Sequence, residues 1–496
     1  MSSADSAHEE VPDYKRASTD AALLDIAKLL ARKKDFKKAM LAYQRLIVAF
    51  PESAFKYTAY YEAGYLRWRL GEVKEAKAIL ADIANSSAAA SLKAKAEGLV
   101  AGIDSALLRA THEDGSAAIG VVLALKGIYA PYGEAALKGA LLGSGIFAPP
   151  QPGVRPDMQP GAKGERASMT VYVRDVGDEP AKAVDAVKEL SSNANVLGIV
   201  GPLLSANALD AAREAQNDGV PIITLSQREG AAPGSGWAFR NSMTLASQAS
   251  ALAAYAVGTL GLKRFAVIYP QNAYGEKMSS LFGEDAQRLG ASVVAVASYE
   301  DGATDFSAVL KQAFNVAVKT RKEGRRTIKE YEPKLQADAV FIPDYFETVG
   351  MLLPYLEYLN IKDIQLLGTS GWNSARFASA AGKAAEGAVF VDAFFAGSKR
   401  QGAAGFTADF EKVYSAEPGV IEAAAYDAAL ALRSLIAAKK DGEAPAPDRS
   451  AVRDGLKSLK GIGGAAGEIS FNASGEAVKK LFFLTVKNGQ IIEAGR

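Results

Sequence analysis

Cysteine is absent from this 496-residue chain, and only two histidines, His8 and His112, are present. Without thiols the chain can form no disulfide, no thiolate metal site and no cysteine nucleophile. Both histidines lie in polar segments outside the predicted α/β core, so histidine catalysis and a histidine-rich metal site are not expected. We therefore predict neither a metal nor an organic cofactor.

Long apolar runs, an excess of charge and enzyme motifs are missing as well. No stretch reaches the ~18 apolar residues that would predict a membrane-spanning helix. The 57 basic and 56 acidic residues give a formal net charge of +1 and form no dominant basic face, so nucleic acid is not an expected partner. The chain carries no P-loop, HExxH or GxSxG sequence. These absences argue against an enzyme.

The N-terminal part of the chain is predicted to be helical. Residues 1–17 are polar and predict a disordered tether, whereas residues 18–112 show the periodicity of consecutive helices. Two segments in this region, DFKKAMLAYQRLIVAFP from Asp35 and EVKEAKAILADIA from Glu72, repeat with an offset of 37 residues. That offset is close to the ~34-residue tetratricopeptide period. Helical hairpins of the tetratricopeptide type are predicted, and an unrelated α-hairpin bundle is the alternative.

From Ala117 onward, predicted strands and helices alternate. Nine strands are expected, at Ala118–Leu123, Met169–Arg174, Val196–Val200, Pro221–Leu225, Arg264–Tyr269, Ser292–Ser298, Ala339–Ile342, Gln365–Gly368 and Ala388–Asp392. Repeated strand–helix units predict parallel sheets with helices on both faces. So many strands over ~380 residues favour two lobes over a single sheet.

Two inserts interrupt this alternation. Pro149–Ala167 is rich in proline and glycine and is predicted to be a surface loop. Val318–Lys334 is a mixed but basic charge run. A solvated helix or loop is the expected structure of this second insert, and a docking surface for an acidic partner is the alternative interpretation.

The candidate binding residues lie in loops that follow strands. Tyr129 and Tyr132 follow the first buried strand, in the segment IGVVLALKGIYAPYGEAALKG. Ser205, in GPLLSANA, is expected at a helix N-terminus, where its hydroxyl and the free N–H groups suit a carboxylate. Ser226 and Arg228, in the next such loop TLSQREG, would lie beside Ser205 if the two strands are neighbours. Capping of a helix is the alternative role for each serine.

Several of these motifs together resemble the type 1 periplasmic binding proteins, the Leu/Ile/Val-binding family. The resemblance rests on the opening strand–loop–helix segment, on GP-x-x-S followed by A-x-x-A and GVPIIT-x-S, and on later segments in matching order: NAYGEKM from Asn272, TDF from Thr304, ADAVFIPDYFE from Ala337, GVIEAAAYDA from Gly419, GEISFN from Gly467 and KNGQ from Lys487. It covers residues 117–496, with the two inserts extra.

The resemblance implies an α/β fold with two lobes (a Venus-flytrap fold), preceded here by the all-α tetratricopeptide-like domain. Lobe one is expected at about 117–242 and 395–467. Lobe two is expected at about 243–394 and 468–496. The ligand of such a protein binds in the cleft between the lobes, which close over it.

The resemblance also implies roles for single residues. The family's contacts to a ligand carboxylate fall on Ser205 and Ser226, and its aromatic lid falls on Tyr274. A further pocket contact is expected on or near Tyr345. Arg228 stands where the family often has a small hydroxyl residue, and its guanidinium would add a bidentate contact to an anion.

The loop Thr369–Trp372 departs from the family pattern. Amino-acid binders commonly offer a carboxylate to the ligand ammonium at this place, but the loop reads TSGW. Asp344 is an alternative partner for an ammonium, and a ligand without an amine is the other explanation. Trp372 is itself a candidate ligand contact.

Two functions are compatible with this organisation. The first is an extracytoplasmic solute receptor that captures a small polar ligand, such as an amino acid or a related carboxylate, and delivers it to an ABC permease without catalysis. The second follows from the order of the domains, which also resembles envelope lipoproteins that activate penicillin-binding proteins through protein contacts, here through the helical repeats. Both imply a periplasmic location. The first sixteen residues lack the apolar core of a signal peptide, so a leader removed before Ser2 and a native lipid anchor are expectations from the resemblance alone.

Overall fold

The computed structural model of the chain describes residues 13–33, 35–69, 73–106, 117–145, 169–228, 230, 236–323, 326–437 and 447–495. The chain divides into two compact units, Met1–Ser242 with Gln401–Val478, and Met243–Arg400 with Lys479–Arg496. The first unit contains the helical domain and lobe one, and the second unit is lobe two. The chain passes between the units after residues 242, 400 and 478, whereas the sequence interpretation expected passages after 242, 394 and 467. The insert Pro149–Ala167, both histidines and residues 1–12 of the expected tether lie outside the described residues.

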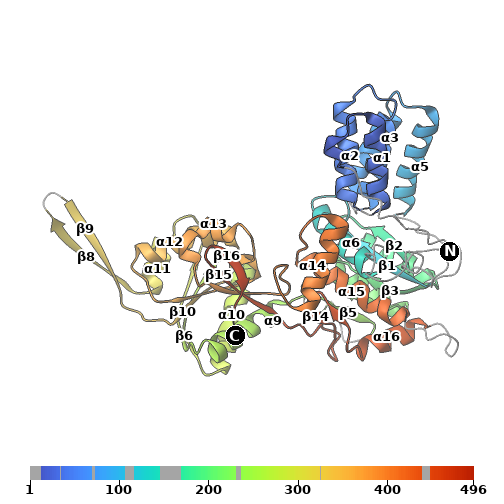
Figure 1. Cartoon of the computed structure of the whole chain (residues 1–496). Coiled ribbons are helices and arrows are strands. Elements are labelled where there is room, and N and C mark those ends of the chain that lie inside the picture. The colour runs from blue at the N-terminus through green and yellow to red at the C-terminus, as the bar shows by residue number, and fades with distance from the viewer. Residues whose placement is uncertain are drawn as a thin grey trace, which may run out of the picture. The chain divides into compact units, whose positions relative to one another are not determined.

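Five α-helices form the N-terminal helical domain (Figure 1): α1, Asp20–Arg32; α2, Phe36–Ala49; α3, Lys56–Arg69; α4, Val73–Ala84; and α5, Ala90–Ala106. They follow a single 3₁₀ turn at Tyr14–Arg16. The aligned residues Ala39 and Ala76 of the two repeats are fully buried. A Cβ atom on Gly64 of α3 would lie 3.0 Å from Leu80 Cγ of α4. Small side chains thus let the helices pack closely, as the repeat pattern predicts.

Lobe one is built on a five-stranded parallel sheet with the order β2-β1-β3-β4-β5. The strands are β1, Ala118–Leu123; β2, Thr170–Asp175; β3, Val196–Val200; β4, Ile222–Thr224; and β5, Ala238–Arg240. The helices are α6, Ala130–Gly143; α7, Pro180–Ser192; α8, Ser205–Asn217; α14, Gln401–Tyr414; α15, Val420–Ile436; and α16, Arg449–Lys457. A small hairpin of β13, Gly463–Gly464, and β14, Gly467–Glu468, completes the lobe.

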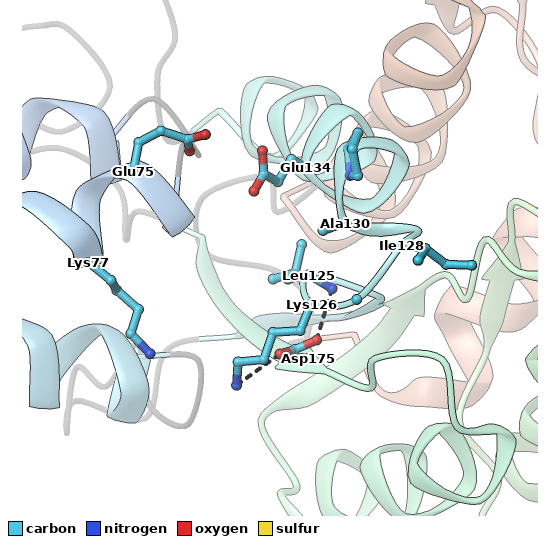
Figure 2. A pocket seen from close by; sticks show the side chains of 10 residues that line it. Glu75, Lys77, Leu125, Lys126, Ile128, Ala130, Glu134 and Asp175 are labelled. Atoms are coloured by element: carbon cyan, nitrogen blue, oxygen red, sulfur yellow. Dashed lines mark hydrogen bonds and ion pairs between the residues drawn. The ribbon is translucent and has the colours of Figure 1, made fainter.

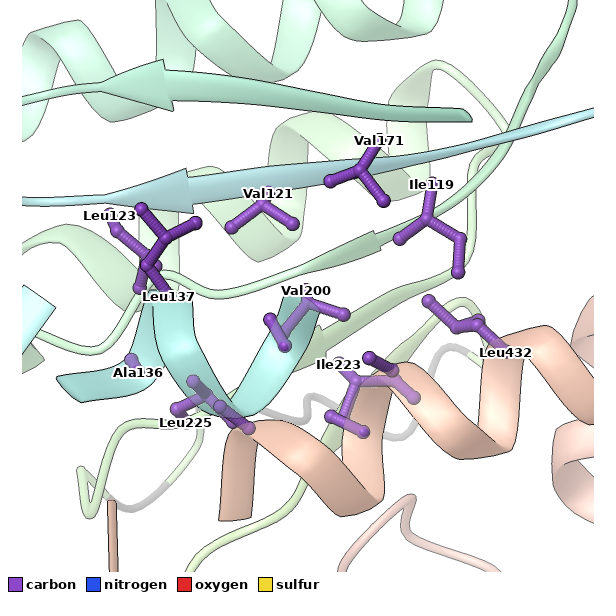
Figure 3. Close-up of a cluster of buried hydrophobic side chains, with 14 of the residues drawn as sticks. Ile119, Val121, Leu123, Ala136, Leu137, Val171, Val200, Ile223, Leu225 and Leu432 are labelled. Atoms are coloured by element: carbon purple, nitrogen blue, oxygen red, sulfur yellow. The ribbon is translucent and has the colours of Figure 1, made fainter. Parts of the chain in front are cut away.

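Both faces of the lobe-one sheet are covered by helices, which explains its continuous apolar strands. Ile119, Val121 and Leu123 of β1 point to the face where α6 and α15 pack (Figure 3). Ala118 and Val122 of the same strand belong to the opposite cluster, which α7 and α8 close. The alternation of neighbouring side chains between the two faces is the period of two that a strand imposes.

Lobe two has a seven-stranded mixed sheet with the order β16-β15-β12-β11-β10-β6-β7. Its strands are β6, Arg264–Pro270; β7, Ser292–Tyr299; β10, Ala339–Ile342; β11, Gln365–Gly368; β12, Val389–Asp392; β15, Phe482–Lys487; and β16, Gln490–Glu493. Its helices are α9, Leu245–Ala254, with a π-helical turn at Tyr255–Thr259; α10, Ala273–Arg288; α11, Ser307–Ala313; α12, Phe346–Tyr358; and α13, Phe377–Ala381, with 3₁₀ turns at Ser370–Trp372 and Gly382–Ala385. The last two strands run antiparallel and join β12 at one end of the sheet.

The nine strands expected from the sequence are all present, with ends shifted by one residue or less. The interpretation of Val318–Lys334 as a solvated helix or loop is wrong. Val316–Glu323 (β8) and Arg326–Pro333 (β9) form an antiparallel ribbon of two strands. Charged residues alternating with β-branched and aromatic side chains are compatible with an exposed ribbon as well as with a loop. The pairing between strands that distinguishes the two cannot be read from a short stretch of sequence. Among the described residues, no helix is both long and apolar enough to span a bilayer.

Candidate functional site

Ser205 and Ser226 come together at one edge of the lobe-one sheet. β3 and β4 are parallel neighbours, so the loops that follow them leave the sheet side by side. The Ser226 hydroxyl donates to Ser205 Oγ at 3.3 Å. Ser205 does not cap α8, whose N-cap is Leu204 and provides no side-chain hydrogen bond, and the residues described directly after Ser226, Gln227 and Arg228, are not helical.

Arg228 lies over this pair of serines. Its Nη1 donates to the carbonyl oxygen of Ser205 at 3.2 Å, and its backbone N–H donates to Ser226 Oγ at 3.0 Å. Ser205 and Arg228 are exposed, whereas Ser226 is fully buried. The groups that a solute can reach directly here are therefore the Ser205 hydroxyl and the Arg228 guanidinium, while the buried Ser226 hydroxyl bonds to Ser205 Oγ and to the backbone N–H of Arg228.

The loop Ser226–Arg228 is fixed by residues that sequence reasoning missed. Buried Arg240 donates from Nη1 to the carbonyl oxygen of Gln227 at 3.1 Å and to that of Arg228, and from Nε to Glu476 Oε2 at 2.6 Å. The Ser242 hydroxyl donates to the carbonyl oxygen of Ser226 at 2.6 Å. Arg240 and Glu476 are 236 residues apart, so no local pattern could have paired them.

Tyr129 and Tyr132 lie in the β1–α6 connection, at the same carboxyl edge of the sheet, because β1 pairs in parallel with β3. They are 40% and 53% exposed, so both rings are available to a ligand. The turn is tight: a Cβ atom on Gly133 would fall 1.8 Å from the carbonyl oxygen of Ala124. A glycine at this position allows the helix to begin directly against the strand end.

Lobe two brings Tyr274 and Tyr345 together at the carboxyl edge of its own sheet. Their rings stack with centroids 5.8 Å apart. The Tyr274 hydroxyl donates to Thr369 Oγ1 at 2.9 Å, and burial raises the pKa of Tyr274 to about 12. Tyr345 remains 59% exposed. The pair thus consists of an anchored ring and an open ring.

Asp344 is committed to the protein itself. Its Oδ2 accepts from the Tyr299 hydroxyl at 2.7 Å and its Oδ1 accepts from the backbone N–H of Tyr345 at 2.7 Å. The side chain is buried, and this burial raises the pKa of the Asp344 carboxyl. Because both oxygens already hold the loop, we do not carry Asp344 forward as the partner of a ligand ammonium.

Trp372 is a packing residue in this structure. It is fully buried, with its ring centroid 5.1 Å from that of Phe377 and 6.1 Å from that of Phe390. A Cβ atom on Gly368 would lie 2.1 Å from the indole, so the strand end leaves room for the ring beneath it. With its ring fully buried, Trp372 is not proposed as a ligand contact.

The sequence pattern of the family described as periplasmic binding protein matches residues 116–490. The chain belongs to this periplasmic binding protein family. A tetratricopeptide repeat pattern matches residues 21–53 of the helical domain.

Two curated relatives of this periplasmic binding protein are both Leu/Ile/Val-binding proteins. The protein BraC3 of Rhizobium johnstonii is 25% identical over 373 residues, which cover 74% of this chain and 90% of the relative. The protein of Citrobacter freundii is 24% identical over 271 residues, 54% of this chain and 65% of the relative, so this match spans slightly less than two thirds of that protein. A Streptococcus pneumoniae substrate-binding protein of a branched-chain amino acid transporter, solved with isoleucine, matches 76% of this chain and 97% of its own (TM-score 0.53, 22% identity). That likeness shows the fold.

The YDA motif of this periplasmic binding protein has a structural role. Asp427 in α15 is buried, and its carboxylate accepts from the backbone N–H groups of Ala465 and Ala466 at 2.6 and 3.3 Å. A Cβ atom on Gly464 would lie 2.3 Å from Asp427 Oδ1. Asp427 thus holds the β13–β14 hairpin against α15.

A cavity of about 480 Å³ lies in the first unit, between the helical domain and the β1–α6 connection (Figure 2). It is lined by Glu75 and Lys77 of α4 and, from lobe one, by Leu125, Lys126, Gly127, Ile128, Ala130, Pro131, Glu134 and Asp175. Lys126 Nζ lies 3.1 Å from Asp175 Oδ2. None of the residues predicted to bind a ligand lines this cavity. In the described residues, no group of three or more acidic or histidine side chains is placed to hold a metal ion.

Proposed function

We propose that this chain is an extracytoplasmic solute receptor that captures a small polar ligand bearing a carboxylate, an amino acid or a related acid, between its two lobes for ABC-type uptake. The observation that carries the proposal is the cluster of Ser205, Ser226 and Arg228 at the carboxyl edge of the lobe-one sheet. Crevices at the carboxyl ends of parallel strands are the usual ligand sites of open α/β folds.

The chemistry of this cluster suits an anion. A hydroxyl and a guanidinium are both hydrogen-bond donors, and an arginine can meet a carboxylate with two parallel hydrogen bonds. Among the described residues, no carboxylate accepts from the Arg228 side chain, which donates to the neutral carbonyl oxygen of Ser205. An incoming carboxylate would replace that weaker acceptor with a charged one.

Lobe two supplies a surface for the rest of the ligand. The stacked rings of Tyr274 and Tyr345 offer a flat, largely apolar face next to a hydroxyl. Aromatic rings of this kind suit an aliphatic or planar side chain. The names of the curated relatives agree with an aliphatic amino acid as the first ligand to test.

The receptor function implies a permease in the membrane as partner and a location outside the cytoplasm. Membership of the periplasmic binding protein family supports that location. No contact of the described residues favours the alternative of a penicillin-binding protein activator, so we do not propose it.

The proposal is tested by isothermal titration calorimetry of the full chain with L-leucine, L-isoleucine, L-glutamate and benzoate. We expect at least one carboxylate to bind, and a ligand present at 100 times its Kd to stabilise the fold by about 2.7 kcal/mol. Ser205→Ala and Arg228→Gln should each weaken binding about tenfold, the effect of one lost charge-assisted hydrogen bond.

Arg213→Gln is the matched control, because Arg213 is an exposed lobe-one arginine whose partner is Asp210, one turn away on α8. This variant should bind as the unmodified chain does. Binding that survives both Ser205→Ala and Arg228→Gln would remove the cluster from the site. An absence of binding across the four carboxylates would reject the receptor function as stated.

A further inference from the structure

The β8–β9 ribbon stands apart from the main sheet of lobe two. Its strands pair only with each other among the described residues, with Val316 opposite Pro333 and Glu323 opposite Arg326. In Figure 1 the ribbon extends away from the helices and strands of that lobe. An isolated ribbon of two strands is marginally stable in water, and its outer edges leave backbone N–H and C=O groups without a strand partner.

The two faces of the ribbon differ in charge. Directly opposed residues of an antiparallel pair lie on the same face, and the faces alternate along each strand. One face carries Val316, Val318, Thr320, Lys322, Thr327, Lys329, Tyr331 and Pro333. No acidic residue is among them, and we call this the acid-free face. All three acidic residues of the strands, Glu323, Glu330 and Glu332, register on the other face.

On the other face, the two glutamates with described side chains, Glu330 and Glu332, are paired with basic residues. Lys319 Nζ and Lys334 Nζ each lie 2.8 Å from Glu332 Oε2. Arg321 Nε lies 3.9 Å from Glu330 Oε1. Within the part of the ribbon whose side chains are described, no carboxylate pairs with Lys322 or Lys329, which are exposed on the acid-free face beside threonines. Charged residues that only kept an exposed strand from aggregating would need to lie on one face alone, and the paired charges of the other face already fill that role.

The end of the acid-free face that carries Tyr331 contacts the rest of lobe two, where Lys311 adds a further positive charge. The hydroxyls of Tyr331 and Tyr358 lie 2.9 Å apart, and Lys311 Nζ lies 5.3 Å from the centre of the Tyr331 ring. These contacts fix the proximal end of the ribbon. The distal half, with Lys322 and Lys329, extends the same positive surface away from the helices of the lobe.

We propose that the acid-free face is a docking surface for an acidic polypeptide segment of a partner protein. An extended segment can pair with the open edge of a strand, and its carboxylates would meet the uncompensated lysines. A second copy of this chain is a poor occupant, because face-to-face pairing would oppose lysine to lysine. A bilayer is a poor occupant as well, since the distal half of the face, Thr320, Lys322, Thr327 and Lys329, offers no large apolar side chain to insert.

The test uses the full chain and a fluorescently labelled poly-L-glutamate peptide, with binding followed by fluorescence anisotropy at low and at physiological ionic strength. We expect binding that weakens with salt. The double variant Lys322→Glu/Lys329→Glu should bind about tenfold more weakly, because two attractive charge contacts become repulsive. Lys322→Gln/Lys329→Gln should show a smaller loss and keeps the test valid if charge reversal disturbs the ribbon.

The matched control is Lys362→Glu/Lys399→Glu, which makes the same change of net charge at exposed lysines of lobe two outside the ribbon. It should bind within about twofold of the unmodified chain. Three results would overturn the proposal: no binding of the unmodified chain, an equal loss in the control, or charge reversal on the ribbon that abolishes sedimentation with phosphatidylglycerol vesicles while leaving peptide binding intact. The last result would assign the face to a membrane surface.

Discussion

Arg240 is the residue whose replacement tests the lobe-one site most directly. Its side chain is 4% exposed and donates to Glu476 and to the carbonyl oxygens of Gln227 and Arg228. Arg240→Gln removes the charge that Glu476 faces and takes the donor away from two loop carbonyls. The loop Ser226–Arg228 should then open more often, although no residue of the loop itself is changed.

The size of this effect follows from the burial of the pair. Breaking a buried ion pair by removing one partner costs about 3–5 kcal/mol. The Glu476 side chain keeps 24% of its surface exposed, so water compensates part of the lost interaction, and we expect roughly 2–3 kcal/mol. At about 1.4 kcal/mol per factor of ten, that is a roughly 30- to 150-fold increase in the local opening equilibrium.

Hydrogen–deuterium exchange with mass spectrometry measures that opening at individual segments. Good reporters are the N–H of Leu225, bonded to the carbonyl of Pro202 at 3.0 Å, and the N–H of Ala477, bonded to the carbonyl of Arg240 at 2.9 Å. Arg213→Gln is the control, since Arg213 and Asp210 are both about 60% exposed and their pair should contribute little. If Arg240→Gln exchanges no faster than the control at both reporters, the anchoring argument is wrong.

Three further predictions concern packing and titration. Gly139→Ala should destabilise the first unit by about 1–3 kcal/mol, seen in thermal unfolding, because its Cβ would fall 2.1 Å from the carbonyl oxygen of Glu422 in α15; an unchanged melting temperature would contradict this close approach. Burial raises the pKa of the Asp392 carboxyl to about 6, above its unfolded value of 3.8. The unfolding free energy of lobe two should therefore fall as pH rises from about 4 to 6, by up to about 3 kcal/mol. Denaturant titrations should show that Asp392→Asn flattens this dependence on pH, and an equal slope in the variant would refute the assignment. Trp372→Ala should lower the unfolding free energy by about 3–5 kcal/mol in the same denaturant titrations, whereas Tyr345→Ala should lower it by less than about 1 kcal/mol because the Tyr345 ring is exposed. Similar losses in the two variants would mean that Trp372 is not a core residue.

The central strands of both sheets could be predicted because they are buried on both faces. The run Ala118–Leu123 has no exposed residue, so hydrophobicity alone marks it. The β8–β9 ribbon and the short strand β5 lack that signal. Half of the ribbon residues are charged, and β5 is only three residues long. In both cases a neighbouring strand, not a local apolar run, determines the conformation.

Part of the candidate site could be predicted from the sequence as well. Ser205 and Ser226 could be placed at one edge because consecutive strand–helix units usually lie next to each other in a parallel sheet. The burial of an individual side chain could not be predicted, because it depends on contacts with segments that are distant in the sequence. Ser226, expected to contact a ligand carboxylate, is buried, and Trp372 lies beneath a strand end. Gly368, four residues before Trp372, was the one local sign that space had been left for a large ring.

The positions of the anchoring residues bear on how the site could respond to lobe movement. Arg240 and Ser242 directly precede the passage of the chain after residue 242, and Glu476 directly precedes the passage after residue 478. The loop that carries Ser226 and Arg228 is thus bonded to two of the three segments that change direction when a two-lobed protein opens or closes. A solute that orders this loop therefore acts on the same hydrogen bonds that the connecting segments use. If the chain is a receptor, occupancy of the lobe-one cluster and the state of the connecting segments are thermodynamically linked, and each must bias the other by the same free energy.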